Sequence, residues 1–408
     1  MKKILSLILA AVMLFSLTAC SSSMSDKTDA TPASSEEAAS ADTAKTEQTA
    51  AGGTIKIDLI CGLTGAQPLE GKHSSEAVEM AMNEINANGG VLGCTLEAVV
   101  LDDALSADQD IICMTNLCEN EDVVAVMGPP RTGSVTAVSS IVAEYGMPTL
   151  VSGTGVSVYD LNNEYMFRVR ASDKIFAKMA AKYMVEELGC KKVGVMYNND
   201  DFGNGGLDVI QQYISEEHPE VEVVSEGHTT GDVDMSGQLL KLKDAGCDGM
   251  ITWTNGAESI VIARQFYELS LAKQMKFLGS AGIGNSEFYT TVSAEAGNGV
   301  YGVVDFVKTA ENVQTFVENF RAAYGDDPDL GASAYYDAVY VLAAAIERAG
   351  VAERTAIRDA LLETDQQGNQ GHLYCDENRD LIHQCMIYQY DGSSGALEQK
   401  LIGVVTEE

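Results

Sequence analysis

The chain has 408 residues, of which 60 are acidic and 26 are basic, so its formal net charge at neutral pH is −34. Such an excess of acid argues against a nucleic-acid partner and against a surface that adheres to anionic lipid. The length allows two lobes of ordinary domain size, each with its own hydrophobic core.

The N-terminal residues differ in composition from the rest. Residues 1–20 carry two lysines, an apolar run and the ending Leu-Thr-Ala-Cys, which is typical of a secretory signal with a bacterial lipobox. Cys20 is then the lipidation site, although an ordinary signal peptide or an uncleaved anchor is the alternative. Residues 21–53 are Ser, Thr, Ala and charged residues without aromatics, which predicts a disordered tether or weak helix. We therefore expect a membrane attachment through an N-terminal lipid anchor.

Residues 54–103 predict a strand, a glycine-bearing loop, a helix, a turn and a second strand. The apolar run at 55–60 is typical of a strand that is covered on both faces. Apolar residues then recur at helical spacing, behind Ser74 or Ser75 as N-cap and before Gly89–Gly90 as the stop. The simplest interpretation is a βαβ unit with a parallel sheet.

The same plan continues with a helix at 107–119 and a strand at 123–127. The loop at 128–134 leads into a helix, and a strand at 148–151 ends in the loop 152–155. Both strands end in loops rich in Gly, Ser and Thr at the carboxyl edge of the sheet. Ligands bind at that edge in open α/β folds.

A second series of units follows residue 173. Strands are expected at 193–197, 221–225, 249–253 and 276–279, with helices at 174–188, 207–214, 235–245 and 258–269. The chain should return to the first lobe near Gly302, with helices at 316–324 and 334–349 and terminal strands within 371–405.

Several segments closely resemble the branched-chain amino-acid-binding proteins, the extracytoplasmic receptors of ABC importers. They include GLTGAQPLEG at 62–71, AVEMAMNEINANGGVLG at 77–93, NDDFG at 199–203 and LLKLKDAGCDG at 239–249. The resemblance covers about residues 54–405 and implies the type I periplasmic-binding fold. That is an α/β fold of two doubly wound parallel-sheet lobes joined by a three-segment hinge. Lobe 1 would comprise 54–173 and 303–384, and lobe 2 would comprise 174–302 and 385–408.

A receptor for an amino acid needs N–H groups and hydroxyls for the carboxylate, a buried anion for the ammonium and a shaped wall for the side chain. Thr132, Gly133 and Ser134 lie where a loop becomes a helix, so free N–H groups and hydroxyls point to one place. The resemblance implies that Thr132 binds the carboxylate, although helix capping alone would also explain its hydroxyl. It places the second carboxylate loop at Thr154, followed by Ser157.

For the ammonium, the resemblance implies Asp173 in the segment that begins at Arg168. Asp173 could also be the N-cap of the following helix, and the two roles can coexist. Phe202 matches an aromatic residue that covers the ligand from the second lobe, with a structural role as the alternative.

Three positions depart from the family pattern. Asn255 replaces a tyrosine, Ala281 replaces the glutamate that completes the ammonium site, and Glu70 replaces an aromatic residue. Loss of one partner of a buried charge pair costs ~3–5 kcal/mol. Either Glu70 replaces the lost glutamate, or the ligand presents no α-ammonium in the usual place. Arg131 either adds a second carboxylate partner, which would favour an acidic ligand or a small amide, or is a solvated surface residue.

The nine cysteines include Cys20, and the other eight are expected to be mostly buried free thiols. Cys113 and Cys118 are five positions apart on a predicted helix, which exceeds disulfide reach. Relatives often carry a disulfide at two positions that are Leu105 and Arg131 here. The Cys and His spacings match no zinc site, and we expect no metal and no cofactor.

Enzyme motifs are lacking in the sequence. Gly65 to Lys72 lacks phosphate-loop spacing, and neither a G-x-S-x-G elbow nor a dinucleotide G-x-G-x-x-G after the first strand is present. A membrane-attached hydrolase is the least favoured hypothesis. We expect a monomeric, lipid-anchored receptor in the cell envelope that binds a small polar solute between the lobes and delivers it to the permease subunits of an ABC importer. The solute would be an amino acid or a relative, with branched-chain amino acids among the candidates. The alternative is a ligand-sensing module of the same fold for an amide or a short carboxylate.

Overall fold

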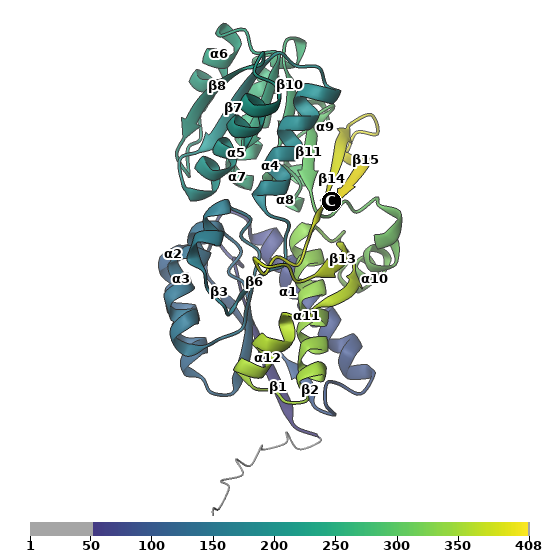
Figure 1. Cartoon of the computed structure of the whole chain (residues 1–408). Helices are drawn as coiled ribbons and strands as arrows, with labels where there is room; N and C mark the ends of the chain where they lie inside the picture. Colours follow the sequence, from purple (N-terminus) through teal and green to yellow (C-terminus); the bar gives the residue numbers. More distant parts are fainter. Residues whose placement is uncertain (1–51, 407–408) are drawn as a thin grey trace, which may run out of the picture. The chain divides into compact units, whose positions relative to one another are not determined.

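Two β-sheets organise the part of the chain that the computed structural model describes, residues 52–406 (Figure 1). The predicted signal peptide, Cys20 and the tether up to residue 51 lie outside the described residues. These features therefore stay predictions.

The first sheet has six strands in the order β2-β1-β4-β5-β6, with β3 also beside β1. Every pairing in it is parallel. The predicted strand that ends near Asp103 is divided into β2 and β3. The bounds are β1 Thr54–Cys61, β2 Thr95–Glu97, β3 Val100–Asp102, β4 Val123–Met127, β5 Thr149–Val151 and β6 Met166–Arg168.

The helices that connect these strands are α1 Pro68–Ala87, α2 Ala107–Glu119 and α3 Thr132–Tyr145, followed by the 3-10 helix η1 Val156–Leu161. The bounds of α2 are those predicted. The predicted start of α1 is wrong, because the helix begins at Pro68 and both Ser74 and Ser75 lie inside it. Proline is favoured at the first helical position because its fixed φ suits a helix and its missing N–H leaves no donor unpaired.

The second sheet has seven strands in the order β15-β14-β11-β10-β9-β7-β8. The strands from β7 to β11 pair in parallel, whereas β14 is antiparallel to β11 and β15 is antiparallel to β14. This sheet is therefore mixed at one edge. The bounds are β7 Lys192–Asn198, β8 Glu222–His228, β9 Gly249–Trp253, β10 Lys276–Gly279, β11 Tyr301–Val304, β14 Gln384–Asp391 and β15 Glu398–Thr406.

Helices connect and flank these strands. They are α4 Asp173–Lys182, which continues as the π-helix η2 Tyr183–Glu187, α5 Asp201–Glu217, α6 Ser236–Asp244, α7 Gly256–Glu268, η3 Leu271–Lys273, η4 Ala281–Ile283, α8 Ser286–Thr291 and α9 Ala294–Gly297. The start of α5 lies six residues before the predicted Leu207, which places Phe202 on the helix.

After β11 the chain forms η5 Glu311–Val313, α10 Gln314–Tyr324, α11 Leu330–Ala349, α12 Arg354–Leu361 and the hairpin β12 Asp365–Gly368 and β13 Gly371–Tyr374. Helix α11 packs along α1. Strand β11 runs to Val304, past the predicted return near Gly302, and β14 begins at Gln384. The two sheets are consistent with the predicted lobes, whose residue boundaries stay a prediction.

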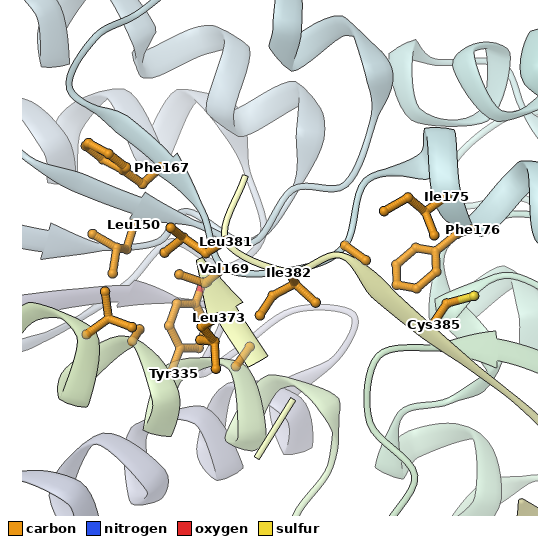
Figure 2. Close-up of a cluster of buried hydrophobic side chains, with 14 of the residues drawn as sticks. Leu150, Phe167, Val169, Ile175, Phe176, Tyr335, Leu373, Leu381, Ile382 and Cys385 are labelled. Carbon is orange, nitrogen blue, oxygen red and sulfur yellow. The ribbon is translucent and has the colours of Figure 1, made fainter. Parts of the chain in front are cut away.

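Two of the segments that connect the sheets run side by side. Arg168 N donates to Arg379 O over 2.9 Å, and Leu381 N donates to Arg168 O over 2.9 Å. Arg168 Nε lies 3.2 Å from Asp380 Oδ1. Figure 2 shows that buried side chains of both segments, Val169 and Leu381 among them, join one hydrophobic cluster. The crossing is therefore held by backbone hydrogen bonds, an ion pair and apolar packing.

Free thiols are found at Cys61, Cys113, Cys118, Cys190, Cys247, Cys375 and Cys385, and all but Cys375 are buried. For these residues the expected free thiols are confirmed. No helix within residues 52–406 has the length and apolarity needed to cross a membrane.

Candidate functional site

A cavity of about 270 Å³ lies where loops from the carboxyl ends of strands in both sheets meet. Its wall brings together eight of the ten predicted ligand-binding residues: Glu70, Thr132, Gly133, Ser134, Thr154, Phe202, Asn255 and Ala281. Ser157 and Asp173 are not part of this wall. The parallel strands thus gather loops from across the sequence at one place, as expected for an open α/β fold.

The N-terminus of α3 provides the predicted carboxylate-binding groups. Thr132 is 3% exposed, and its Oγ1 accepts a hydrogen bond from Gly155 N over 3.0 Å. Because that oxygen already accepts, its own hydrogen can be donated to a ligand. The first-turn N–H groups of Thr132, Gly133 and Ser134 have no carbonyl partner within the helix, and the helix dipole is positive there. This arrangement suits a carboxylate.

Two glycines allow the second loop to lie against the start of α3. A Cβ atom on Gly155 would come within 2.5 Å of Thr132 Cγ2, and one on Gly153 would lie 3.0 Å from Thr132 N. The close approach places Thr154 on the cavity wall. The carbonyl of Thr154 accepts from Arg168 Nη1 over 3.1 Å and from Asp173 N over 2.9 Å.

Asp173 lies behind the wall at the first residue of α4. Ser172 is the N-cap, because its side chain accepts from Lys174 N, so the alternative of Asp173 as N-cap is wrong. Asp173 is 1% exposed, and its Oδ2 accepts from Trp253 Nε1 over 3.0 Å. Its Oδ1 has no hydrogen-bond partner among the described residues. Burial raises the pKa of Asp173 to about 6, against the effect of the Trp253 bond, which lowers it.

The second sheet contributes three of the predicted residues. Asp200 caps α5 by accepting from Gly203 N over 2.9 Å, which places half-buried Phe202 in the first turn. The Phe202 ring lies 6.2 Å from the Trp253 ring. Asn255 is the N-cap of α7 and Ala281 begins η4.

Ser157 lies in η1, outside the cavity wall. Its hydroxyl oxygen is buried and has no hydrogen-bond partner among residues 52–406. Its predicted role in ligand binding stays a prediction.

Sequence reasoning missed a chain of polar contacts on the wall beside α1. Arg131 Nη2 donates to Gln67 Oε1 over 2.6 Å, and Gln67 Nε2 donates to Glu70 Oε2 over 2.7 Å. Arg131 lines the cavity and is half-buried, which disfavours the interpretation as a plain surface residue. Burial raises the pKa of Glu70 to about 8, and the nearby carboxyl groups of Asp329 and Glu287 raise it further.

Glu287 of α8 is a second residue that sequence reasoning missed. Its Oε1 accepts from Leu69 N over 2.7 Å and from Glu70 N over 2.9 Å, so it caps the N-terminus of α1. Burial raises the pKa of Glu287. No local pattern could have indicated this contact, because the partners are more than two hundred residues apart in the sequence.

Arg170 also lines the cavity, yet its charge is already paired. Its Nε and Nη2 donate to the two carboxylate oxygens of Asp305 over 2.6 and 2.7 Å, and both residues are buried. The pair joins two of the connecting segments. Within the described part of the chain, no group of three His, Cys, Asp or Glu side chains is placed to hold a metal ion.

Two β-sheets with connecting helices place loops around one shared cavity. This is the arrangement of a two-lobed solute-binding protein. The chain belongs to the periplasmic binding protein family, whose model matches residues 54–396. It is 28% identical over 331 residues to the leucine-, isoleucine-, valine-, threonine- and alanine-binding protein of Pseudomonas aeruginosa, covering 80% of this chain and 87% of that protein.

Solved structures show the same architecture. The branched-chain amino acid transporter substrate-binding protein LivJ of Streptococcus pneumoniae, in complex with isoleucine, is similar with a TM-score of 0.77 and 25% identity, covering 86% of this chain and 99% of that one. A solute-binding protein of an ABC transporter from Rhodopseudomonas palustris, in complex with 3,4-dihydroxybenzoic acid, has a TM-score of 0.79 at 20% identity, covering 86% and 97%. The second likeness concerns the fold alone.

The predicted family and fold are therefore confirmed. The chain is a substrate-binding protein of the ABC-transporter type, it acts outside the cytoplasm, and it is not an enzyme.

Proposed function

We propose that this receptor binds a small solute with an amino-acid backbone in the cavity and delivers it to the permease subunits of an ABC importer. In this proposal the carboxylate of the solute lies at the N-terminus of α3, and its ammonium lies toward Asp173. The receptor acts as a monomer that is attached to the membrane through acylated Cys20.

The arrangement around Thr132 carries the proposal. Gly155 N occupies one acceptor position of the Thr132 hydroxyl, which leaves the O–H to donate beside the free N–H groups of the first turn. Hydrogen bonds from such donors to a charged group contribute about 1.5–3 kcal/mol each. Asp173 supports the ammonium site from behind the wall, because it is a buried carboxyl group whose Oδ1 has no hydrogen-bond partner among the described residues and which can balance a positive charge in the cavity.

Isothermal titration calorimetry of the purified protein with the common amino acids tests this proposal. At least one amino acid should bind, and Asp173→Asn should weaken it strongly, because a neutral amide cannot balance the ammonium charge. Circular dichroism would confirm that the variant is folded. Failure of every amino acid to bind the folded wild type would contradict the proposal.

Mass spectrometry of the protein extracted from cell envelopes tests the anchor. Acyl mass on Cys20 and release of Cys20→Ser into the soluble fraction are expected. An unmodified Cys20 would contradict this part of the proposal without affecting the ligand.

A solute with a carboxylate but no ammonium is the second candidate. It is favoured by Ala281, which carries no charge at the position where the resemblance would place a glutamate. The protein from Rhodopseudomonas palustris in complex with 3,4-dihydroxybenzoic acid shows that this fold holds such a solute. A carboxylate of this kind should bind Asp173→Asn at least as well as the wild type.

A further inference from the structure

The wall beside α1 carries a connected row of three polar side chains, Arg131, Gln67 and Glu70, and all three line the cavity. Arg131 donates to the carbonyl oxygen of Gln67, and the amide nitrogen of Gln67 donates to Glu70. A guanidinium can only donate, so Arg131 fixes the orientation of the Gln67 amide. The row therefore has a defined polarity, with donors at Arg131 and a carboxyl oxygen at Glu70.

Both ends of the row have hydrogen-bonding capacity left. A guanidinium has five N–H donors, and among the described residues Gln67 alone accepts from Arg131. Arg170, by contrast, is committed to Asp305 through two hydrogen bonds. At the other end, Oε2 of Glu70 accepts from Gln67, and Oε1 has no hydrogen-bond partner within residues 52–406. Arg131 and Glu70 are thus the groups that can recognise a solute here.

The charge state of Glu70 limits which solutes fit. Its carboxyl group can accept a hydrogen bond in either form, because a protonated carboxyl keeps its carbonyl oxygen. A second carboxylate on the solute would only accept, so it could bind Glu70 only while that carboxyl group holds its proton, whereas the NH₂ group of a carboxamide can donate to Glu70 in either form. An aliphatic side chain would leave the remaining donors of Arg131 and Oε1 of Glu70 without partners, and unpaired polar groups in a site weaken binding.

We propose that the solute carries a carboxamide beyond its carboxylate, with its carbonyl oxygen bound by Arg131 and its NH₂ group bound by Glu70. This inference rests on the proposed function, because it takes the carboxylate to lie at Thr132. Arg131 directly precedes Thr132, so the two polar ends of the solute are close together. The structure therefore favours a short amino acid with a terminal amide.

Leucine, asparagine and aspartate test this inference, because their side chains branch at the same carbon and have the same number of heavy atoms. Isothermal titration calorimetry of the full chain should compare these three and then glutamine and glutamate. Asparagine or glutamine should bind at least ~100-fold more tightly than leucine, because a site built for hydrogen bonds rejects an analogue that lacks them.

Arg131→Met separates recognition of the amide from the general attraction of a positive charge. The ratio of amide affinity to leucine affinity should fall roughly tenfold or more, since loss of one hydrogen bond to a charged group has about this effect. The matched control is Arg264→Met, which removes an exposed arginine from α7 and should leave the ratio unchanged. Circular dichroism would confirm that both variants are folded.

The outcomes distinguish this inference from the proposed function. Preference for leucine, isoleucine or valine would overturn the carboxamide and leave the amino-acid receptor standing. Preference for aspartate or glutamate would do the same in favour of an acidic side chain. Binding of no amino acid by the folded wild type would overturn both. An unchanged ratio in Arg131→Met would remove Arg131 from the recognition of the amide and overturn the inference.

Discussion

Of the helices that begin at the cavity, α1 and α3 differ in which groups satisfy the N–H groups of their first turns. At α1 the N–H groups of Leu69 and Glu70 donate to Glu287, a carboxylate of the same chain. At α3 the side chain of the N-cap residue Arg131 makes no capping hydrogen bond, and Thr132 presents a hydroxyl beside the first-turn N–H groups. Both ends can bind an anion, although Pro68 leaves α1 with one first-turn donor fewer than α3. The protein thus satisfies the N–H groups at α1 with a carboxylate of its own, whereas those at α3 stay available for the carboxylate of the proposed solute.

Thr132→Val should have the largest effect, because it removes the hydroxyl at α3 while preserving the shape of the side chain. The solute then loses one hydrogen bond to its carboxylate, worth about 1.5–3 kcal/mol, so the dissociation constant should rise roughly 10- to 150-fold. Calorimetric titration with the best-binding amino acid measures this change.

The control for this experiment is Thr136→Val, one turn further along α3. Thr136 is exposed, and its hydroxyl donates to Thr132 O over 3.2 Å, away from the first-turn donors. Equal losses of affinity in the two variants would show that α3 is disturbed as a whole. They would contradict a specific role of the Thr132 hydroxyl in binding the solute.

Glu287→Ala should affect stability at α1. The change leaves the N–H groups of Leu69 and Glu70 without their carboxylate, and loss of a helix cap costs about 0.5–2 kcal/mol. Glu287→Gln keeps an accepting oxygen and removes the charge, so it should lie between the wild type and the alanine variant. Urea denaturation without added solute gives the free energies of unfolding, and a stability of Glu287→Ala equal to that of the wild type would contradict the capping role.

Helices α1 and α3 also show which features of the fold and the site can be predicted from the sequence. Buried strands such as β4 and β9 have the predicted bounds, because a continuous apolar run between turn residues is a local signal. The position of Thr132 at the start of α3 on the cavity wall was predicted as well, since the resemblance and the loop-to-helix boundary indicate the same residue; its role in binding stays a prediction. The start of α1 was not predicted, because Ser74 and Ser75 have the local pattern of caps while the real cap is Glu287, which the fold brings in from α8.

The same distinction applies to the rest of the site. Asp173 was predicted from its motif, but its burial behind the wall depends on Trp253, which comes from β9. The Arg131–Gln67–Glu70 row joins the start of α1 to the N-cap residue of α3, so no local spacing indicates the contact of Arg131 with Gln67. Contacts between segments that are distant in sequence are set by topology and packing. From a single sequence they can be predicted only through its resemblance to a known family.

Glu70→Gln should change how the stability of the protein depends on pH. Burial raises the pKa of Glu70 from 4.5 to about 8, so the folded protein binds a proton that the unfolded chain has released. The contribution of this group to stability is therefore complete below about pH 4.5 and is lost as the pH rises toward about 8. Because part of the Glu70 side chain is exposed to solvent, the change in stability should be smaller than the full pKa difference implies.

Urea denaturation of the wild type and Glu70→Gln between these pH values measures the effect. The wild type should lose stability relative to the variant as the pH rises. Glu121→Gln, which changes an exposed glutamate in the turn before β4, should follow the wild type. A parallel course of the wild type and Glu70→Gln across the whole range would show that Glu70 ionises normally.

The smallest expected effect concerns anion binding at the N-terminus of α1. It shows whether this N-terminus can bind an anion, as proposed for that of α3, once Glu287 is removed. In Glu287→Ala the N–H groups of Leu69 and Glu70 are left free to bind an anion, as those of α3 are in the wild type. Acetate can replace the lost carboxylate, and an anion at a helix N-terminus contributes about 0.3–1 kcal/mol. Acetate should therefore raise the unfolding temperature of Glu287→Ala slightly more than that of the wild type, with sodium chloride at equal ionic strength as the reference. Equal shifts in both proteins would mean that the start of α1 binds no anion without the geometry of α8, and that its N-terminus differs from that of α3 in structure as well as in occupancy by Glu287.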